Sequence, residues 1–181
     1  DGGTTWTHSF GGSTGVTTIG STSGQTFVHG QYNVNDVKAW NNGGSTVIFA
    51  AFGANSFSFT GTFPTFIGAS EYGLYKSTDN GSSWSLVNNN VPDTSHPYEI
   101  NDIEIAADNS IWVSTRNTVF GDGGGVILSS TDGVTFSDKH TITGGKRTQI
   151  AASSTNAGTF YVLAQGGATP VTILKTTDSF D

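Results

Sequence analysis

Apolar and polar residues alternate along most of this chain, and the apolar positions favour β-branched and aromatic side chains. Gly, Asn, Asp and Ser interrupt the alternation at short intervals, which is typical of strands joined by turns. No stretch keeps the 3.6-residue period of an amphipathic helix. The pattern therefore predicts an all-β protein. Strands are expected at Asn35–Trp40, Thr46–Phe52, Gly73–Ser77, Ser83–Val87, Ile100–Ala106, Ser110–Thr115, Gly125–Ser130, Thr148–Ala152, Thr159–Ala164 and Val171–Thr176.

A segment that ends in an aspartate turn recurs along the sequence. Gly73–Trp84 is repeated at Gly125–Phe136 with a turn one residue shorter, and Val171–Asp178 begins the segment a third time. Asp1–Trp6 corresponds to the second half of a further copy. The aspartates at 1, 79, 132 and 178 are separated by 78, 53 and 46 residues. Two of these intervals match the roughly 40 to 50 residues of a four-stranded propeller blade.

A second repeated element supports the same division of the chain. Tyr32–Val37 parallels Tyr98–Ile103, and each segment opens the first strand of a unit. The middle unit then has four strands, the last of which is expected at Val134–Ser137. The chain is thus expected to be one partial β-propeller domain. Its parts are residues 1–10 as the last strand of a preceding blade, 11–90 as a blade with insertions, 91–140 as a blade, and 141–181 as an incomplete blade.

The turn pattern Ser/Thr-x-Asp-x-Gly-x-x-Trp resembles the Asp-box, or BNR, repeat. Similar repeats occur in sialidases, sortilin-type receptor propellers, xyloglucan-active glycoside hydrolases and many secreted bacterial propeller proteins. The resemblance implies about three four-stranded antiparallel blades within a larger propeller of about seven blades. The residues that carry it are Asp1, Gly3, Trp6, Ser77, Asp79, Gly81, Trp84, Ser130, Asp132, Phe136, Thr176 and Asp178.

The chemistry of this pattern is that of a turn. A short aspartate side chain accepts hydrogen bonds from backbone N–H groups of its own turn, and Gly81 can adopt a positive φ without steric cost. Trp84 can then cover the turn and fill space between neighbouring sheets. We therefore interpret Asp79 and Asp132 as structural residues. Asp36 and Asp102, which recur at one position of the repeat, are first interpreted as turn or strand-entry residues.

Composition and charge exclude several classes of function. The chain has 7 Lys and Arg against 14 Asp and Glu, a net charge of −7, and no Cys. It lacks the basic blocks that bind nucleic acid and any apolar run approaching the ~20 residues that would insert into a membrane. No loop has the ligand spacing of a calcium site, and neither a metal nor another cofactor is predicted. The surface rich in Ser, Thr, Asn and Gly favours an exported protein, whether extracellular, on the cell surface or periplasmic.

The resemblance also assigns the loops to two faces of the propeller, with the aspartate turns on the face away from the ligand. Loops on a rigid scaffold often carry function, and Tyr and Arg are frequent at binding hot spots. Alternatively, His29 and His96 are loop residues that pack a Tyr at a repeated corner. The loops of the expected ligand face are Gly11–Gln31, Gly53–Ser70, Asn88–Tyr98, Arg116–Gly124 and Thr141–Arg147. The candidate ligand-binding residues are His29, Tyr32, His96, Tyr98, Arg116 and Arg147.

Three functions are consistent with these observations. The first is a non-catalytic domain that binds a protein or polysaccharide, with the remaining blades of a parent chain as structural partners. The second is a xyloglucanase-like glycoside hydrolase, which needs two carboxylates about 5 to 10 Å apart. Candidate catalytic residues are Asp36, Glu71 and Asp102, with Glu99 and Asp122 also on the expected face. The third is a spacer. A sialidase is disfavoured, because those enzymes hold the substrate carboxylate with three arginines and this chain has two.

Overall fold

The fold is antiparallel β-sheet throughout the described chain. In this computed structural model the structure describes residues 3–7, 21–22, 25–26, 32–57, 65–67, 72–118, 120–166 and 171–181, and this part contains no helix. The strands are β1 (Ser21–Thr22), β2 (Gln25–Thr26), β3 (Tyr32–Asn42), β4 (Ser45–Phe57), β5 (Thr65–Ile67), β6 (Gly73–Ser77), β7 (Ser85–Leu86), β8 (Glu99–Ile105), β9 (Ile111–Arg116), β10 (Val126–Ser130), β11 (Ser137–Thr141), β12 (Gly145–Ala152), β13 (Phe160–Gly166) and β14 (Thr172–Thr176).

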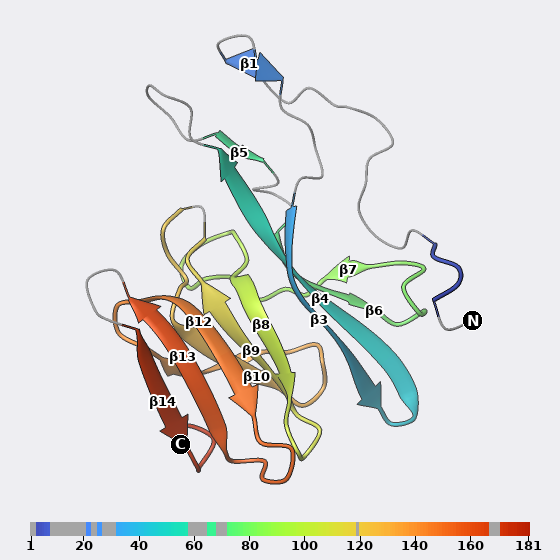
Figure 1. Ribbon diagram of the computed structural model, residues 1–181, viewed down its shortest axis with the longest axis vertical. Coiled ribbons are helices and arrows are strands. Elements are labelled where there is room, and N and C mark those ends of the chain that lie inside the picture. The colour runs from blue at the N-terminus through green and yellow to red at the C-terminus, as the bar shows by residue number, and fades with distance from the viewer. Residues whose placement is uncertain are drawn as a thin grey trace.

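Most of these strands form three consecutive meanders, which we call units 1, 2 and 3 (Figure 1). Unit 1 contains β3, β4, β6 and β7, each paired with the next. Unit 2 contains β8, β9, β10 and β11 in the same arrangement, and unit 3 contains β12, β13 and β14. Strand β12 also pairs with β9 at Arg147 and Arg116, which joins units 2 and 3 into one curled seven-stranded sheet.

Two apolar cores hold the units together, and both use the same strand positions. Phe49 and Leu74 of unit 1 are 0% exposed and face unit 2. Trp112 and Ile127 of unit 2 are 4% and 0% exposed and face unit 3. Leu74 and Ile127 each precede the turn aspartate of their unit by five residues. The residues that receive these side chains also match, with Ile103, Val113 and Leu128 in unit 2 and Ile150, Val162 and Leu174 in unit 3.

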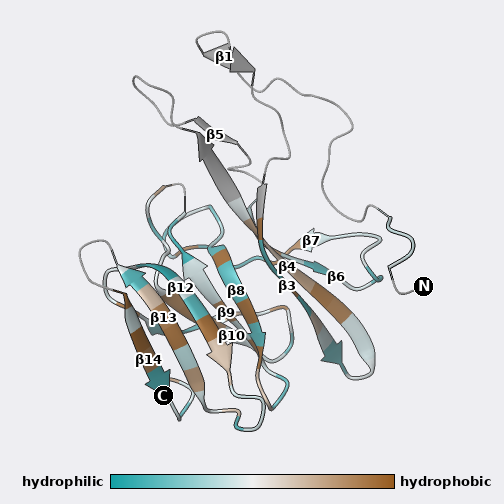
Figure 2. Ribbon diagram, in the orientation of Figure 1, coloured by the Kyte–Doolittle hydropathy of each residue, from teal (hydrophilic) through white to brown (hydrophobic). Residues whose placement is uncertain are grey.

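The corresponding face of unit 3 is exposed. Ile173 precedes Asp178 by five residues and is 74% exposed, and Tyr161 in the neighbouring strand is 48% exposed. Leu163, which pairs with Ile173, is 40% exposed. Figure 2 shows apolar residues along β13 and β14 as it does in the strands that are covered. Unit 3 therefore exposes apolar side chains at the strand positions that units 1 and 2 use to pack against the next unit.

The aspartate turns are closed by their own hydrogen bonds. After β6, Asp79 Oδ1 accepts from the N–H of Ser83 at 2.8 Å and from the hydroxyl of Ser77 at 2.8 Å. The hydroxyl and N–H of Ser83, followed by the Ser77 hydroxyl, lower the pKa of Asp79 to about 2. Gly81 has a φ of +85° in this turn, and its carbonyl accepts from Trp84 Nε1 at 3.2 Å.

The turn after β10 has the same chemistry and packs on unit 1. Asp132 Oδ1 accepts from the N–H groups of Val134 and Thr135, each at 2.8 Å. The ring of Phe136 meets Phe49 edge-on at a centroid distance of 6.3 Å, so this aromatic residue fills space between the units. After β14, Asp178 Oδ1 accepts from the hydroxyl of Thr176 at 2.5 Å.

The structure changes some strand assignments. The fourth strand of unit 2 is β11 at Ser137–Thr141, not Val134–Ser137, because residues 132–136 are used by the turn and by the packing of Phe136. Strand β4 extends to Phe57 and pairs with β5, so the described part of the expected insertion contains a pair of antiparallel strands. Residues 3–7 form a turn and bend rather than a strand, and Trp6 is 88% exposed.

Candidate functional site

The loops between units meet at one end of the strands, which we call the loop end. Glu99 at the start of β8 pairs with Arg116 at the end of β9, and Arg116 pairs with Arg147 near the start of β12. The described parts of three connections, at 87–98, 117–118 with 120–125, and 142–144, therefore lie together, as Figure 1 shows. The opposite end carries the aspartate turns, since Ser130 pairs with Ile111 at the far end of β9. Most of Gly11–Gln31 and Gly53–Ser70 lies outside the described residues.

An open pocket of about 500 Å³ lies at the loop end where units 2 and 3 meet. We call it the basic pocket, because it contains three of the seven Lys and Arg residues of a chain whose net charge is −7. Its volume falls in the usual range of ligand sites. The lining residues are Arg116, Asn117, Lys146, Arg147, Gln165 and Gly166.

Arg116 is held by a buried carboxylate. Its Nε lies 3.2 Å from Oε1 of Glu99, a side chain that is 1% exposed, whereas a third of the Arg116 side chain remains exposed. A carboxylate buried to this extent requires a cationic or hydrogen-bonding partner. The charge of Glu99 also acts on the buried Tyr72. Burial of Tyr72, followed by the charges of Glu99 and Asp122, raises the pKa of Tyr72 to about 12. Arg116 therefore both neutralises a buried acid and lines the pocket.

Arg147 is held by an amide. Its Nε donates to Oδ1 of Asn101 at 2.9 Å, and Nδ2 of Asn101 donates to the carbonyl of Thr148 at 2.6 Å. Asn101 is 4% exposed and is the extra residue where the pairing of β8 with β9 shifts register. This bulge in the strand thus directs a buried amide toward unit 3, where it fixes the arginine at the pocket.

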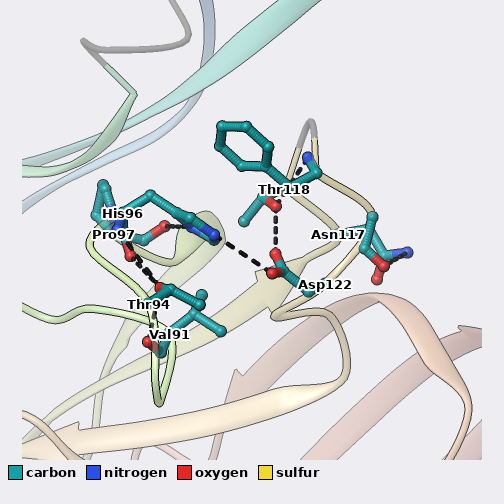
Figure 3. Close-up of polar contacts among 9 residues, drawn as sticks. Val91, Thr94, His96, Pro97, Asn117, Thr118 and Asp122 are labelled. Atoms are coloured by element: carbon teal, nitrogen blue, oxygen red, sulfur yellow. Dashed lines mark hydrogen bonds and ion pairs between the residues drawn. The ribbon is translucent and has the colours of Figure 1, made fainter.

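His96 joins two loops of the loop end. Its Nε2 lies 3.3 Å from Oδ2 of Asp122, and its ring stacks on Phe120 at a centroid distance of 4.5 Å. Oδ1 of Asp122 accepts from the hydroxyl of Thr118 at 2.5 Å (Figure 3). Among the described residues, no hydroxyl contacts the imidazole ring. The arrangement is that of a link between loops, and it lacks a nucleophile beside the histidine.

Asp36 and Asp102 make equivalent contacts to the next unit. Oδ2 of Asp36 accepts from the N–H of Ile103, and Oδ2 of Asp102 accepts from the N–H of Ile150, both at 3.0 Å. The asparagines that precede them also bond to the next unit. The side chain of Asn35 donates to the carbonyl of Ile100 at 2.7 Å, and that of Asn101 donates to the carbonyl of Thr148. We call Asn35-Asp36 and Asn101-Asp102 the Asn–Asp pairs. Both candidate catalytic aspartates are therefore engaged in joining the first strands of successive units.

Asp102 has a perturbed acidity. Burial raises the pKa of Asp102 to about 6, against the opposing hydrogen bond from Ile150, and the charges of Asp36 and Glu104 raise it further. Glu104 is itself paired with Lys38, whose Nζ lies 3.4 Å from its Oε1. Asp36 and Asp102 thus lie close enough to interact across two adjoining first strands.

The remaining predicted site residues are separated from this group. Tyr98 is 3% exposed within the first apolar core, and its hydroxyl donates to Oδ2 of Asp138 at 3.2 Å. The expectation that Tyr98 presents its ring to a ligand is therefore not met, because the ring is buried. His29, Glu71 and Asp1 lie outside the described residues, and only the backbone of Tyr32 is described.

Two functional features escaped the sequence analysis. Lys146 lines the basic pocket but follows two glycines in an unremarkable segment, so nothing in its neighbourhood marks it. Asn35 and Asn101 are bonded across units, and here a signal existed, since both belong to the repeated segments that begin at Tyr32 and Tyr98.

Comparison with known proteins adds no relative. A scan against family models, a search of curated proteins and a search of solved structures each found no match. Within the described residues, no helix has the length and apolar character to cross a membrane, and no three His, Asp or Glu side chains converge as a metal site.

Proposed function

We propose that this chain is an arc of an Asp-box β-propeller from an exported protein, and that it binds a ligand at its loop end without catalysing a reaction. The repeated packing supports the propeller. Units 1 and 2 each bury an aromatic residue and an aliphatic residue at fixed positions against the next unit. Tyr161 and Ile173 repeat these positions at the surface of unit 3. A further four-stranded unit is the structural partner that fits this face.

The basic pocket is the observation that carries the binding function. It gathers Arg116 and Arg147, both expected ligand contacts, at the end of the strands where three loops meet. Binding is favoured over catalysis because Asp36 and Asp102 accept backbone hydrogen bonds that join the units. The proposed ligand class is a polysaccharide, since amide and guanidinium groups line the pocket.

A second candidate is a glycoside hydrolase, which the acidity of Asp102 favours. In that function Asp102, whose pKa burial raises to about 6, would act as the general acid beside Asp36. Turnover of xyloglucan, other β-glucans or sialosides that Asp36→Asn abolishes would replace our proposal with this one.

Binding of the chain to immobilised polysaccharides tests the proposed function. We expect retention of at least one polysaccharide, and loss of this retention when Arg147 is changed to Gln. The matched control is Lys175→Gln, which removes one charge from β14 outside the basic pocket. Retention that both variants reduce equally, or no retention at all, would contradict binding at the loop end.

A further inference from the structure

The basic pocket concentrates positive charge in an acidic protein. Arg116, Lys146 and Arg147 come from two strands that pair at a single position, although the chain carries twice as many acidic as basic residues. Among the pocket's lining residues there is no Asp or Glu, and the nearest carboxylate, Glu99, is buried against Arg116. Such a grouping of cations raises the local concentration of an anionic ligand.

The two arginines are positioned by contacts that leave their outer nitrogens available. Each is held through Nε, Arg116 by Glu99 and Arg147 by Asn101. A guanidinium has five N–H donors, and four of them are on the terminal nitrogens. Apart from these two contacts, neither guanidinium forms a hydrogen bond or ion pair with another described residue. Paired N–H donors of this kind match the two oxygens of a carboxylate.

The rest of the lining favours a sugar over a peptide. Asn117 and Gln165 provide amides, which both donate to and accept from hydroxyl groups. The basic pocket itself has no apolar side chain that would receive a peptide anchor.

We propose that the basic pocket binds a uronate residue of an acidic polysaccharide. Arg116 and Arg147 hold the carboxylate through their terminal N–H groups, Lys146 adds a mobile positive charge, and Asn117 and Gln165 bind ring hydroxyls. This inference rests on the proposed function and narrows its ligand from polysaccharides in general to those that carry carboxylates.

Titration calorimetry with galacturonate oligomers tests the inference. The matched ligand is the methyl ester of the same oligomers, which keeps every hydroxyl and removes the charge. We expect the ester to bind at least tenfold more weakly, and Lys146→Gln and Arg147→Gln each to weaken binding roughly tenfold, as for the loss of one charge-assisted contact. Lys139→Gln, which removes an equal charge from β11, should change the affinity less than about twofold.

The outcomes separate the inference from the function on which it rests. Equal binding of acid and ester, unaffected by Lys146→Gln, would overturn the uronate assignment and leave polysaccharide binding intact. Binding of polyglutamate in place of galacturonate would overturn it in favour of an acidic peptide. Failure of all these ligands and of neutral polysaccharides would overturn both. Because Lys146 is exposed, its variant should fold normally.

Discussion

The carboxylate of Asp102 in β8 accepts a hydrogen bond from the backbone N–H of Ile150 in β12, at 3.0 Å. The contact repeats that of Asp36 with Ile103 one unit earlier. Each acid therefore serves a strand that lies in the next unit, and the two contacts together align three first strands side by side. Buried polar groups that are satisfied in this way specify one arrangement of the strands among those that apolar packing alone would allow.

Replacing Asp102 by Asn should stabilise the protein at neutral pH. The pKa of Asp102 is raised from 3.8 to about 6 by burial and by Asp36 and Glu104, so ionisation costs more in the folded state than in the unfolded state. That cost is absent below about pH 4 and complete above about pH 6. Asn keeps an acceptor for Ile150 without a charge. Urea denaturation should show a gain of about 2 kcal/mol near pH 8 and none near pH 3.5.

The control for this variant is Asp93→Asn, which makes the same change of charge at an exposed position with a positive φ that Asn tolerates. It should show no gain that depends on pH. A loss of stability in Asp102→Asn at every pH would mean that the full charge is needed for the contact with Ile150.

Gly53→Ala should destabilise the contact between units 1 and 2. A Cβ at this position would lie 2.8 Å from Oε1 of Glu99 and 3.0 Å from Nδ2 of Asn35, both of which are fixed by other partners. We expect a loss of about 1 to 3 kcal/mol in the free energy of unfolding, the usual cost of overpacking. Ser45→Ala, at the exposed start of the same strand, should change it by less than about 0.5 kcal/mol. Equal effects of the two variants would argue against close packing at Gly53.

Lysine should be tolerated at Ile173 and not at Ile127. The two residues occupy the same position of the repeat, but Ile173 is 74% exposed and Ile127 is fully buried. Ile127→Lys would bury an unpaired charge and should cost at least about 3 kcal/mol in chemical denaturation. Ile173→Lys should cost less than about 0.5 kcal/mol. A large loss in Ile173→Lys would show that the face of unit 3 is already covered, for example by a second copy of the chain.

Asp132→Ala should lower the melting temperature at neutral pH and have little effect in strong acid. The N–H groups of Thr135 and Val134, with the hydroxyl of Ser130, lower the pKa of Asp132 from 3.8 to about 2. A lowered pKa means that the ionised carboxylate stabilises the fold above about pH 4 and that this contribution is lost as the pH falls to about 2. Melting curves across this range measure the effect. Asp132→Asn keeps one acceptor oxygen and should fall between Ala and the parent chain, and a deficit independent of pH would contradict the proposed cause.

Alternation and turn residues were sufficient to predict most of the strands, because half-buried antiparallel strands impose a period of two on the sequence. The pattern is misleading at Val134–Ser137, where Phe136 has the character of a strand residue but packs between units. The turn aspartates were predictable because their contacts are local, and every partner of Asp132 lies within three residues of it.

The candidate site was predictable only in part, because its geometry depends on contacts between distant segments. Arg116 and Arg147 were expected at one face, but their approach depends on the pairing of β9 with β12. The partner of Asp36 is 67 residues away along the chain and that of Asp102 is 48 residues away. A backbone N–H carries no side-chain signature, so neither partner could be identified from the sequence, and the two acids stayed catalytic candidates beside their first interpretation as turn or strand-entry residues.

The Asn–Asp pairs run in one direction, from each unit to the one that follows, so the assembly has a head and a tail that cannot be exchanged. In unit 3 their places are taken by Thr148 and Gln149, since Gln149 precedes Ile150 as Asp102 precedes Ile103. The amide of Gln149 cannot ionise. A further unit packed on unit 3 would therefore meet, at this position, a side chain whose charge does not depend on pH. Mild acid, which neutralises Asp102, would therefore act on the contact between units 2 and 3 through a group that has no ionisable counterpart at Gln149.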